Sequence, residues 1–115
     1  MAHLDLSYIL DNVSSDRSFI TQLLNVFLVS LEEDIPPLEQ AIEAEDHEQV
    51  RKTAHKVKSS FRSLGMKEMT IYLQTLEDMG KDKKPMATIG EKFTGFISML
   101  PDVKAEVKTS LDEYA

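Results

Sequence analysis

Apolar residues recur at intervals of three and four along most of the chain, which is the spacing of one face of an α-helix. In the first such segment, from Asp16 to about Glu45, the apolar stripe consists of Ile20, Leu23, Leu24, Phe27, Leu31, Ile35, Leu38 and Ile42. Residues 14–16, Ser-Ser-Asp, supply an N-cap for this helix. Pro36 and Pro37 remove two amide donors, yet the stripe keeps its phase on both sides of them. The pattern predicts one kinked helix, or two helices stacked end to end.

Three more amphipathic segments follow. The second helix begins at Asp46, which together with Gln49 resembles a capping pair, and ends at Gly65. Its apolar stripe consists of Val50, Ala54, Val57, Phe61 and Leu64. The third has its stripe at Met69, Tyr72, Leu73, Leu76 and Met79 and ends at Gly80, before a Lys-Asp-Lys-Lys-Pro loop. The last runs from Ile89 to Tyr114 without a phase break at Pro101, which predicts one long, locally kinked helix.

The fold class follows from these segments. Residues 4–10 fit a short N-terminal helix that covers one end of the molecule, and no segment alternates with a period of two. Four amphipathic helices with short connections predict an all-α, antiparallel four-helix bundle. The length of 115 residues matches one domain with one core, so residues 1–115 are taken as a single helical bundle.

Composition narrows the class of protein. Apolar residues make up 42 % and charged residues 29 % of the chain, as in ordinary globular proteins. No segment approaches the roughly 20 apolar residues of a membrane span, and the N-terminus lacks a basic segment followed by an apolar one, so we expect a cytoplasmic protein. Without cysteine there is no thiol nucleophile or thiolate metal site, and three histidines without an H-E-x-x-H pattern argue against a zinc enzyme.

Charge is unevenly distributed. The net charge of −7 argues against binding to nucleic acid or to an anionic membrane. Residues 51–67 nevertheless contain no Asp or Glu and carry a cluster of basic residues, namely Arg51, Lys52, Lys56, Lys58, Arg62 and Lys67. The second helix therefore presents a basic face to an acidic partner.

His55 lies on that helix and outside its apolar stripe, on the same side as Arg51, Lys58 and Arg62. An exposed imidazole with a pKa near its ordinary value of about 6.5 is largely neutral at pH 7, and one of its ring nitrogens then has a free lone pair. Such a nitrogen can accept a phosphoryl group, whose charged oxygens Lys58 can stabilise. The same residues also fit a histidine on a merely solvated helix face.

A family resemblance favours the chemical interpretation. Residues 54–66 read A-H-K-V-K-S-S-F-R-S-L-G-M, which resembles the signature A-H-x-L-K-G-S-[SA]-x-x-L-G-[AM] of histidine-containing phosphotransfer (HPt) domains. The order of the surrounding helices is also similar to that of the family. The resemblance covers nearly the whole chain.

The resemblance implies roles for individual residues. His55 would be the phospho-accepting histidine and Lys58 the lysine beside it, while Gly65 would end the helix. Glu77 stands where HPt proteins often have a Gln or Glu near the histidine, although it also fits a surface acid on a helix flank. Ser59 replaces a usual glycine, and would either narrow the access of a partner or bond to the phosphoryl group. Phe61 replaces a common small residue and belongs to the apolar stripe, so it is interpreted as core.

We therefore expect a phosphoryl carrier, not an enzyme, that relays a phosphoryl group between receiver-domain aspartates through phospho-His55. The partners implied are response-regulator receiver domains and a hybrid histidine kinase, which bind through Arg51, Lys52, Lys56 and Arg62. The domain needs no cofactor or metal of its own, because Mg²⁺ is expected on the receiver, and it is expected to be a monomer. Two alternatives remain: a helical docking module that is never phosphorylated, and the phospho-accepting domain of a chemotaxis-type kinase. His3 and His47 are expected to be exposed and without a role.

Overall fold

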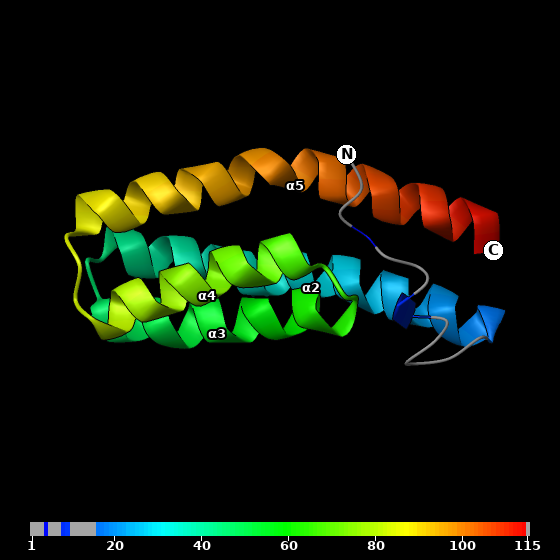
Figure 1. The fold of residues 1–115 in the computed structure, drawn as a ribbon, viewed down its shortest axis with the longest axis horizontal. Helices are drawn as coiled ribbons and strands as arrows, with labels where there is room; N and C mark the ends of the chain where they lie inside the picture. Colours follow the sequence, from blue (N-terminus) through cyan, green and yellow to red (C-terminus); the bar gives the residue numbers. More distant parts are fainter. Residues whose placement is uncertain (1–3, 5–7, 10–15, 115) are drawn as a thin grey trace.

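The computed structural model describes Leu4, Tyr8, Ile9 and residues 16–114. These residues form four long helices and no strand, in the order α2 (Arg17–Glu43), α3 (His47–Ser63), α4 (Lys67–Lys81) and α5 (Met86–Tyr114). Successive helices run in opposite directions, as Figure 1 shows. The predicted all-α antiparallel bundle is confirmed.

The short helix expected over residues 4–10 lies mostly outside the described residues. Tyr8 and Ile9 are helical. Ile9 is fully buried in the core of the bundle, and the amide of Leu4 donates to the Glu106 carboxylate at 3.3 Å. The rest of this helix stays a prediction.

The prolines do not divide the long helices. Pro36 and Pro37 lie inside α2, and Pro101 lies inside α5. All three are exposed, so water can solvate the carbonyl oxygens four residues earlier, which have no amide partner. Of the two predicted arrangements for the first segment, a single helix is therefore the one observed. In the part of the chain that the structure describes, no helix has an apolar stretch long enough to cross a membrane.

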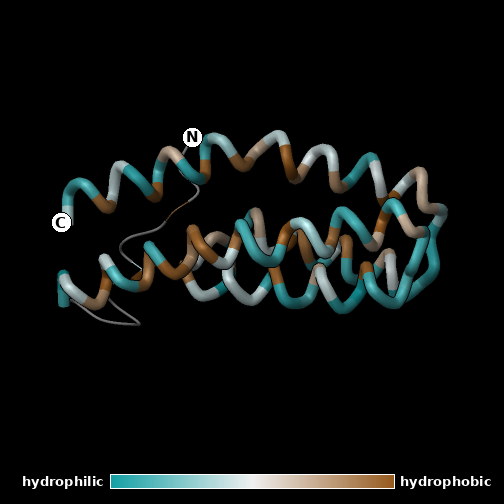
Figure 2. Tube along the Cα trace, turned by 180° about the vertical axis from the view of Figure 1, so that it is seen from behind, coloured by the Kyte–Doolittle hydropathy of each residue, from teal (hydrophilic) through white to brown (hydrophobic). Residues whose placement is uncertain are grey.

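The core lies between the inward faces of the helices, where the hydrophobic positions of each helix gather (Figure 2). At its centre Phe61 of α3 meets two rings edge to face, Phe27 of α2 at 5.1 Å and Phe96 of α5 at 5.7 Å between ring centroids. Phe61 is fully buried, which confirms its interpretation as core. One side of α3 is thereby fixed against α2 and α5.

Two glycines shape the α3–α4 hairpin. Gly65, in the turn, has a φ of 69°, and a side chain there would meet the ring of Tyr8 at 2.6 Å. Gly80 lies near the end of α4, where a Cβ atom would approach the Arg51 amide nitrogen and the His47 carbonyl oxygen, both at 2.8 Å. Because no side chain separates the backbones at Gly80, α4 lies close against the start of α3. This close approach brings the polar side chains of α4 within reach of those on α3.

Candidate functional site

His55 stands on the outer side of α3. Its neighbours Ala54 and Val57 are buried in the core, whereas 57 % of the His55 side chain is exposed. The ring is thus outside the apolar stripe, where the helical spacing placed it. A partner protein can reach it.

Glu77 of α4 holds one nitrogen of this ring. Its Oε1 atom lies 3.1 Å from His55 Nδ1, and the carboxylate is mostly buried, with 18 % of the side chain exposed. An ionised carboxylate only accepts hydrogen bonds, so Nδ1 must carry the hydrogen. The neutral ring then has its lone pair on Nε2, the nitrogen that Glu77 does not hold.

Lys58 is attached to the same acceptor. Its Nζ atom lies 2.9 Å from Glu77 Oε1 and 2.7 Å from Gln74 Oε1. The sequence grouped Lys58 with the exposed residues of the His55 face, but only 8 % of its side chain is exposed. The reason is that its charged end turns toward α4, where two oxygen atoms replace its water. Lys58 is therefore bonded to the acceptor of Nδ1.

The electrostatics of Glu77 agree with this arrangement. Burial by itself would raise the pKa of the Glu77 carboxyl, but the hydrogen bonds from Lys58 and His55 outweigh burial and lower the pKa below its usual value. The group is accordingly ionised at neutral pH. It remains an acceptor for both Nδ1 and the ammonium.

Gln74 and Asp78 belong to this cluster and were missed by the sequence analysis. Gln74 accepts from Lys58, and its Nε2 donates to Asp78 Oδ1 at 2.9 Å. The signal that would have found them is spacing, since residues three and four apart share one side of a helix. In an antiparallel hairpin that side of α4 faces His55 and Lys58.

Ser59, the departure from the family signature, bonds within its own helix. Its hydroxyl donates to the His55 carbonyl oxygen at 3.2 Å. The hydroxyl is thus engaged with the backbone. The two effects predicted for Ser59, on partner access and on the phosphoryl group, stay predictions.

The basic residues of α3 differ in how they are paired. Arg51 forms an ion pair with Glu48, which lowers the pKa of that carboxyl, and Lys56 reaches Asp34 of α2 at 3.3 Å. Lys52 and Arg62 are exposed. Neither forms an ion pair with any residue that the structure describes. The charges of Lys52 and Arg62 are therefore the ones on α3 that are most available to an acidic partner.

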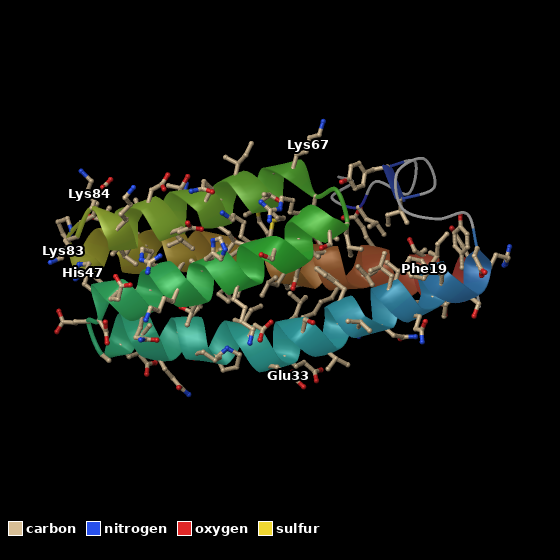
Figure 3. All side chains as sticks on the ribbon, turned by 90° about the horizontal axis from the view of Figure 1, so that it is seen from below. Phe19, Glu33, His47, Lys67, Lys83 and Lys84 are labelled. Carbon is tan, nitrogen blue, oxygen red and sulfur yellow. The ribbon has the colours of Figure 1, made fainter. Side chains whose placement is uncertain are left out.

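His47 is not the exposed residue that the sequence suggested. It is partly buried, and its Nε2 bonds to the Lys84 carbonyl oxygen at 2.7 Å. Figure 3 shows His47, Lys83 and Lys84 together at one end of the bundle and Lys67 at the other end of the hairpin. His47 therefore fastens the α4–α5 loop to the start of α3. His3 lies outside the described residues.

No candidate metal centre accompanies the cluster, since the described residues contain no group of three or more His, Asp or Glu side chains suited to holding an ion. The expectation that Mg²⁺ is bound by a partner stays a prediction.

Comparison with known protein families gives a match that covers most of the chain. A family model described as "Hpt domain" matches residues 22–113, which include all of α3 and α4. No curated protein and no solved structure matches the chain significantly.

Proposed function

The chain belongs to the Hpt domain family, and from this membership we propose that it relays a phosphoryl group between receiver-domain aspartates through His55 in a multistep phosphorelay. The domain is a carrier in this scheme. The partner supplies the rest of the chemistry, including the Mg²⁺ expected on a receiver domain.

The observation that carries the proposal is the contact between His55 Nδ1 and Glu77. With the hydrogen held on Nδ1, the lone pair of Nε2 attacks the phosphorus of a receiver's aspartyl phosphate. The Nε2–P bond forms while the P–O bond to the aspartate breaks, and the aspartate leaves as a carboxylate. The Nδ1 hydrogen stays in place, so the ring becomes a cation next to ionised Glu77, which stabilises the charge. Transfer onward to a second receiver reverses these steps.

Other residues of the face have supporting roles. Lys58, as the nearest buried cation, stabilises charge in the reacting region during transfer, and Ser59 borders the histidine. Arg51, Lys52, Lys56 and Arg62 attract the acidic surface of a receiver, which steers the encounter. We propose that the domain acts as a monomer in the cytoplasm and that a hybrid histidine kinase is a further partner.

The second candidate function is a docking module that binds a receiver or kinase through the basic face without being phosphorylated. The exposed and unpaired charges of Lys52 and Arg62 favour it, because they suit docking whether or not His55 reacts. Acid-labile phosphate on His55 separates the two functions.

The test is to incubate the domain with phosphorylated receiver domains and to map any acid-labile phosphate. We expect phosphate on Nε2 of His55, and none in the His55→Gln variant. His47→Gln is the matched control, since it makes the same change at another histidine of α3. If the domain binds receivers but no histidine is labelled, the relay is overturned and the docking module is supported.

A further inference from the structure

Lys58 is a cation that depends on its two acceptors. With 8 % of its side chain exposed, its ammonium has little access to water, and a buried charge is costly unless it is paired. Gln74 Oε1 at 2.7 Å and Glu77 Oε1 at 2.9 Å provide the partners. Both come from one side of α4. Removal of either acceptor would leave the ammonium incompletely satisfied.

The orientation of the Gln74 amide is determined by charge. Its oxygen faces the Lys58 ammonium, and its nitrogen donates to the Asp78 carboxylate at 2.9 Å. The flipped amide would direct its NH₂ group at a cation and its oxygen at an anion, and both contacts would be repulsive. Asp78 therefore keeps the Gln74 oxygen directed at Lys58.

We propose that Gln74 is a positioning residue that acts through Lys58 on Glu77, and so maintains the hydrogen on Nδ1 of His55. The inference concerns the unphosphorylated domain. Only its consequence for transfer rests on the proposed function.

The physical link runs through the Lys58 ammonium. Without the Gln74 oxygen, the ammonium regains its hydrogen bonds by moving outward to water, and this movement lengthens its contact with Glu77. The described groups that face Glu77 from α3 are His55, Lys58 and Arg51, and Asp78 is its acidic neighbour on α4. The Glu77 carboxylate follows the ammonium outward, so its Oε1 atom moves away from Nδ1 of His55. The weaker bond from Lys58 also opposes the effect of burial less, so the pKa of Glu77 rises.

Displacement of the Glu77 oxygen would release Nδ1 of His55. An ionised carboxylate beside Nδ1 favours the tautomer with its hydrogen on that atom, so loss of the contact lets the neutral ring carry its hydrogen on Nε2. The lone pair needed for attack on phosphorus is then lost. Gln74 thus maintains the reactive tautomer without touching the ring.

The test is nitrogen NMR of the His55 ring across pH, together with carboxyl-carbon NMR of Glu77, in the unphosphorylated domain. In Gln74→Leu we expect the Glu77 titration to move to higher pH and the share of Nδ1–H tautomer to fall. We expect single-turnover acceptance to slow by about fivefold, the scale of a weakened bond to a charged group.

Two further variants make the result specific. Gln74→Met keeps nearly the length of the side chain without an oxygen for Lys58, so it should lose Nδ1–H tautomer as Gln74→Leu does, whereas a purely steric role of Gln74 would be preserved by it. Gln40→Leu makes the same substitution on the exposed side of α2 and should change neither spectrum. Thermal melting checks that each variant is folded.

The outcomes separate the two proposals. An unchanged tautomer and an unchanged Glu77 titration in folded Gln74→Leu would overturn the role of Gln74, even if His55 accepts phosphate. Altered spectra in a domain that no receiver can phosphorylate would support the role of Gln74 and overturn the relay.

Discussion

α3 takes part in two clusters that differ in kind. Toward the core, Phe61 packs between Phe27 and Phe96, and toward the surface His55 and Lys58 share one oxygen atom of Glu77. The aromatic cluster stabilises the bundle by burial, which depends on the area removed from water and has little directional preference. The polar cluster depends on which atom donates and which accepts.

This difference predicts how each cluster responds to substitution. A smaller side chain in the core costs stability in proportion to the contacts and volume lost, while the helices keep their positions. In the polar cluster one misplaced hydrogen would remove the lone pair that the proposed relay uses, with little expected change in the fold. Substitutions in the two clusters should therefore separate stability from phosphoryl transfer.

The largest expected effect is that of His55→Gln. Phosphoryl acceptance should fall to the background level, because no other ring nitrogen lies at this position, while helicity and melting temperature stay nearly unchanged since the side chain is exposed. Acid-labile labelling and circular dichroism measure the two properties. Undiminished labelling of this variant would remove His55 from the mechanism.

Phe61→Ala should have the largest effect on folding. Truncation of a fully buried ring costs about 3–5 kcal/mol of the free energy of unfolding, measured by urea denaturation. The control is Ile71→Ala, because Ile71 is 66 % exposed and its truncation should stay within about 0.5 kcal/mol. Equal losses in both variants would contradict the position of Phe61 at the centre of the core.

Lys58→Ala should slow the transfer step itself. At saturating receiver we expect a loss of roughly 1 kcal/mol of transition-state stabilisation, which is less than at a fully water-excluded site because the histidine face is partly wet. Single-turnover kinetics separate this step from binding. If the saturated rate is unchanged and only association weakens, Lys58 is a docking residue.

Neutralisation of Arg51, Lys52 and Arg62 together should slow association with an acidic receiver and flatten its dependence on salt, with less change in the chemical step. The Lys52 and Arg62 changes alone should account for most of the effect, because Arg51 is already paired with Glu48. Stopped-flow association at several salt concentrations measures this. An equal contribution from Arg51 alone would show that its pair with Glu48 opens when the receiver docks.

The smallest expected effect is the dependence of stability on pH through Glu77. Its pKa in the folded protein is below the ordinary value of 4.5, so the folded state favours the ionised form. The resulting stability is present above pH 4.5 and is lost as the pH falls through the lower folded pKa. The difference in unfolding free energy between wild type and Glu77→Gln should shrink over that range. A constant difference would mean that the ionisation of Glu77 does not stabilise the fold.

Periodicity predicted most of the fold and part of the candidate site. The spacing of apolar residues located all four long helices, placed Phe61 in the core and put His55 outside the core stripe. Helical spacing also grouped Lys58 with the exposed basic residues. That prediction was wrong, because the Lys58 side chain is buried. A helical wheel gives the direction in which a side chain leaves the backbone, and a lysine is long enough to turn its charge toward a neighbouring helix.

The sequence by itself determined which residues form helices and which side of α3 is apolar, because both depend on the local spacing of side chains along one chain segment. Only the tertiary structure decided that Lys58 and His55 share Glu77, that Gln74 and Asp78 complete the cluster, and that His47 holds a loop. These contacts join different elements. Their geometry depends on how closely α4 approaches α3 at Gly80, which is a property of the packed hairpin and not of either helix alone.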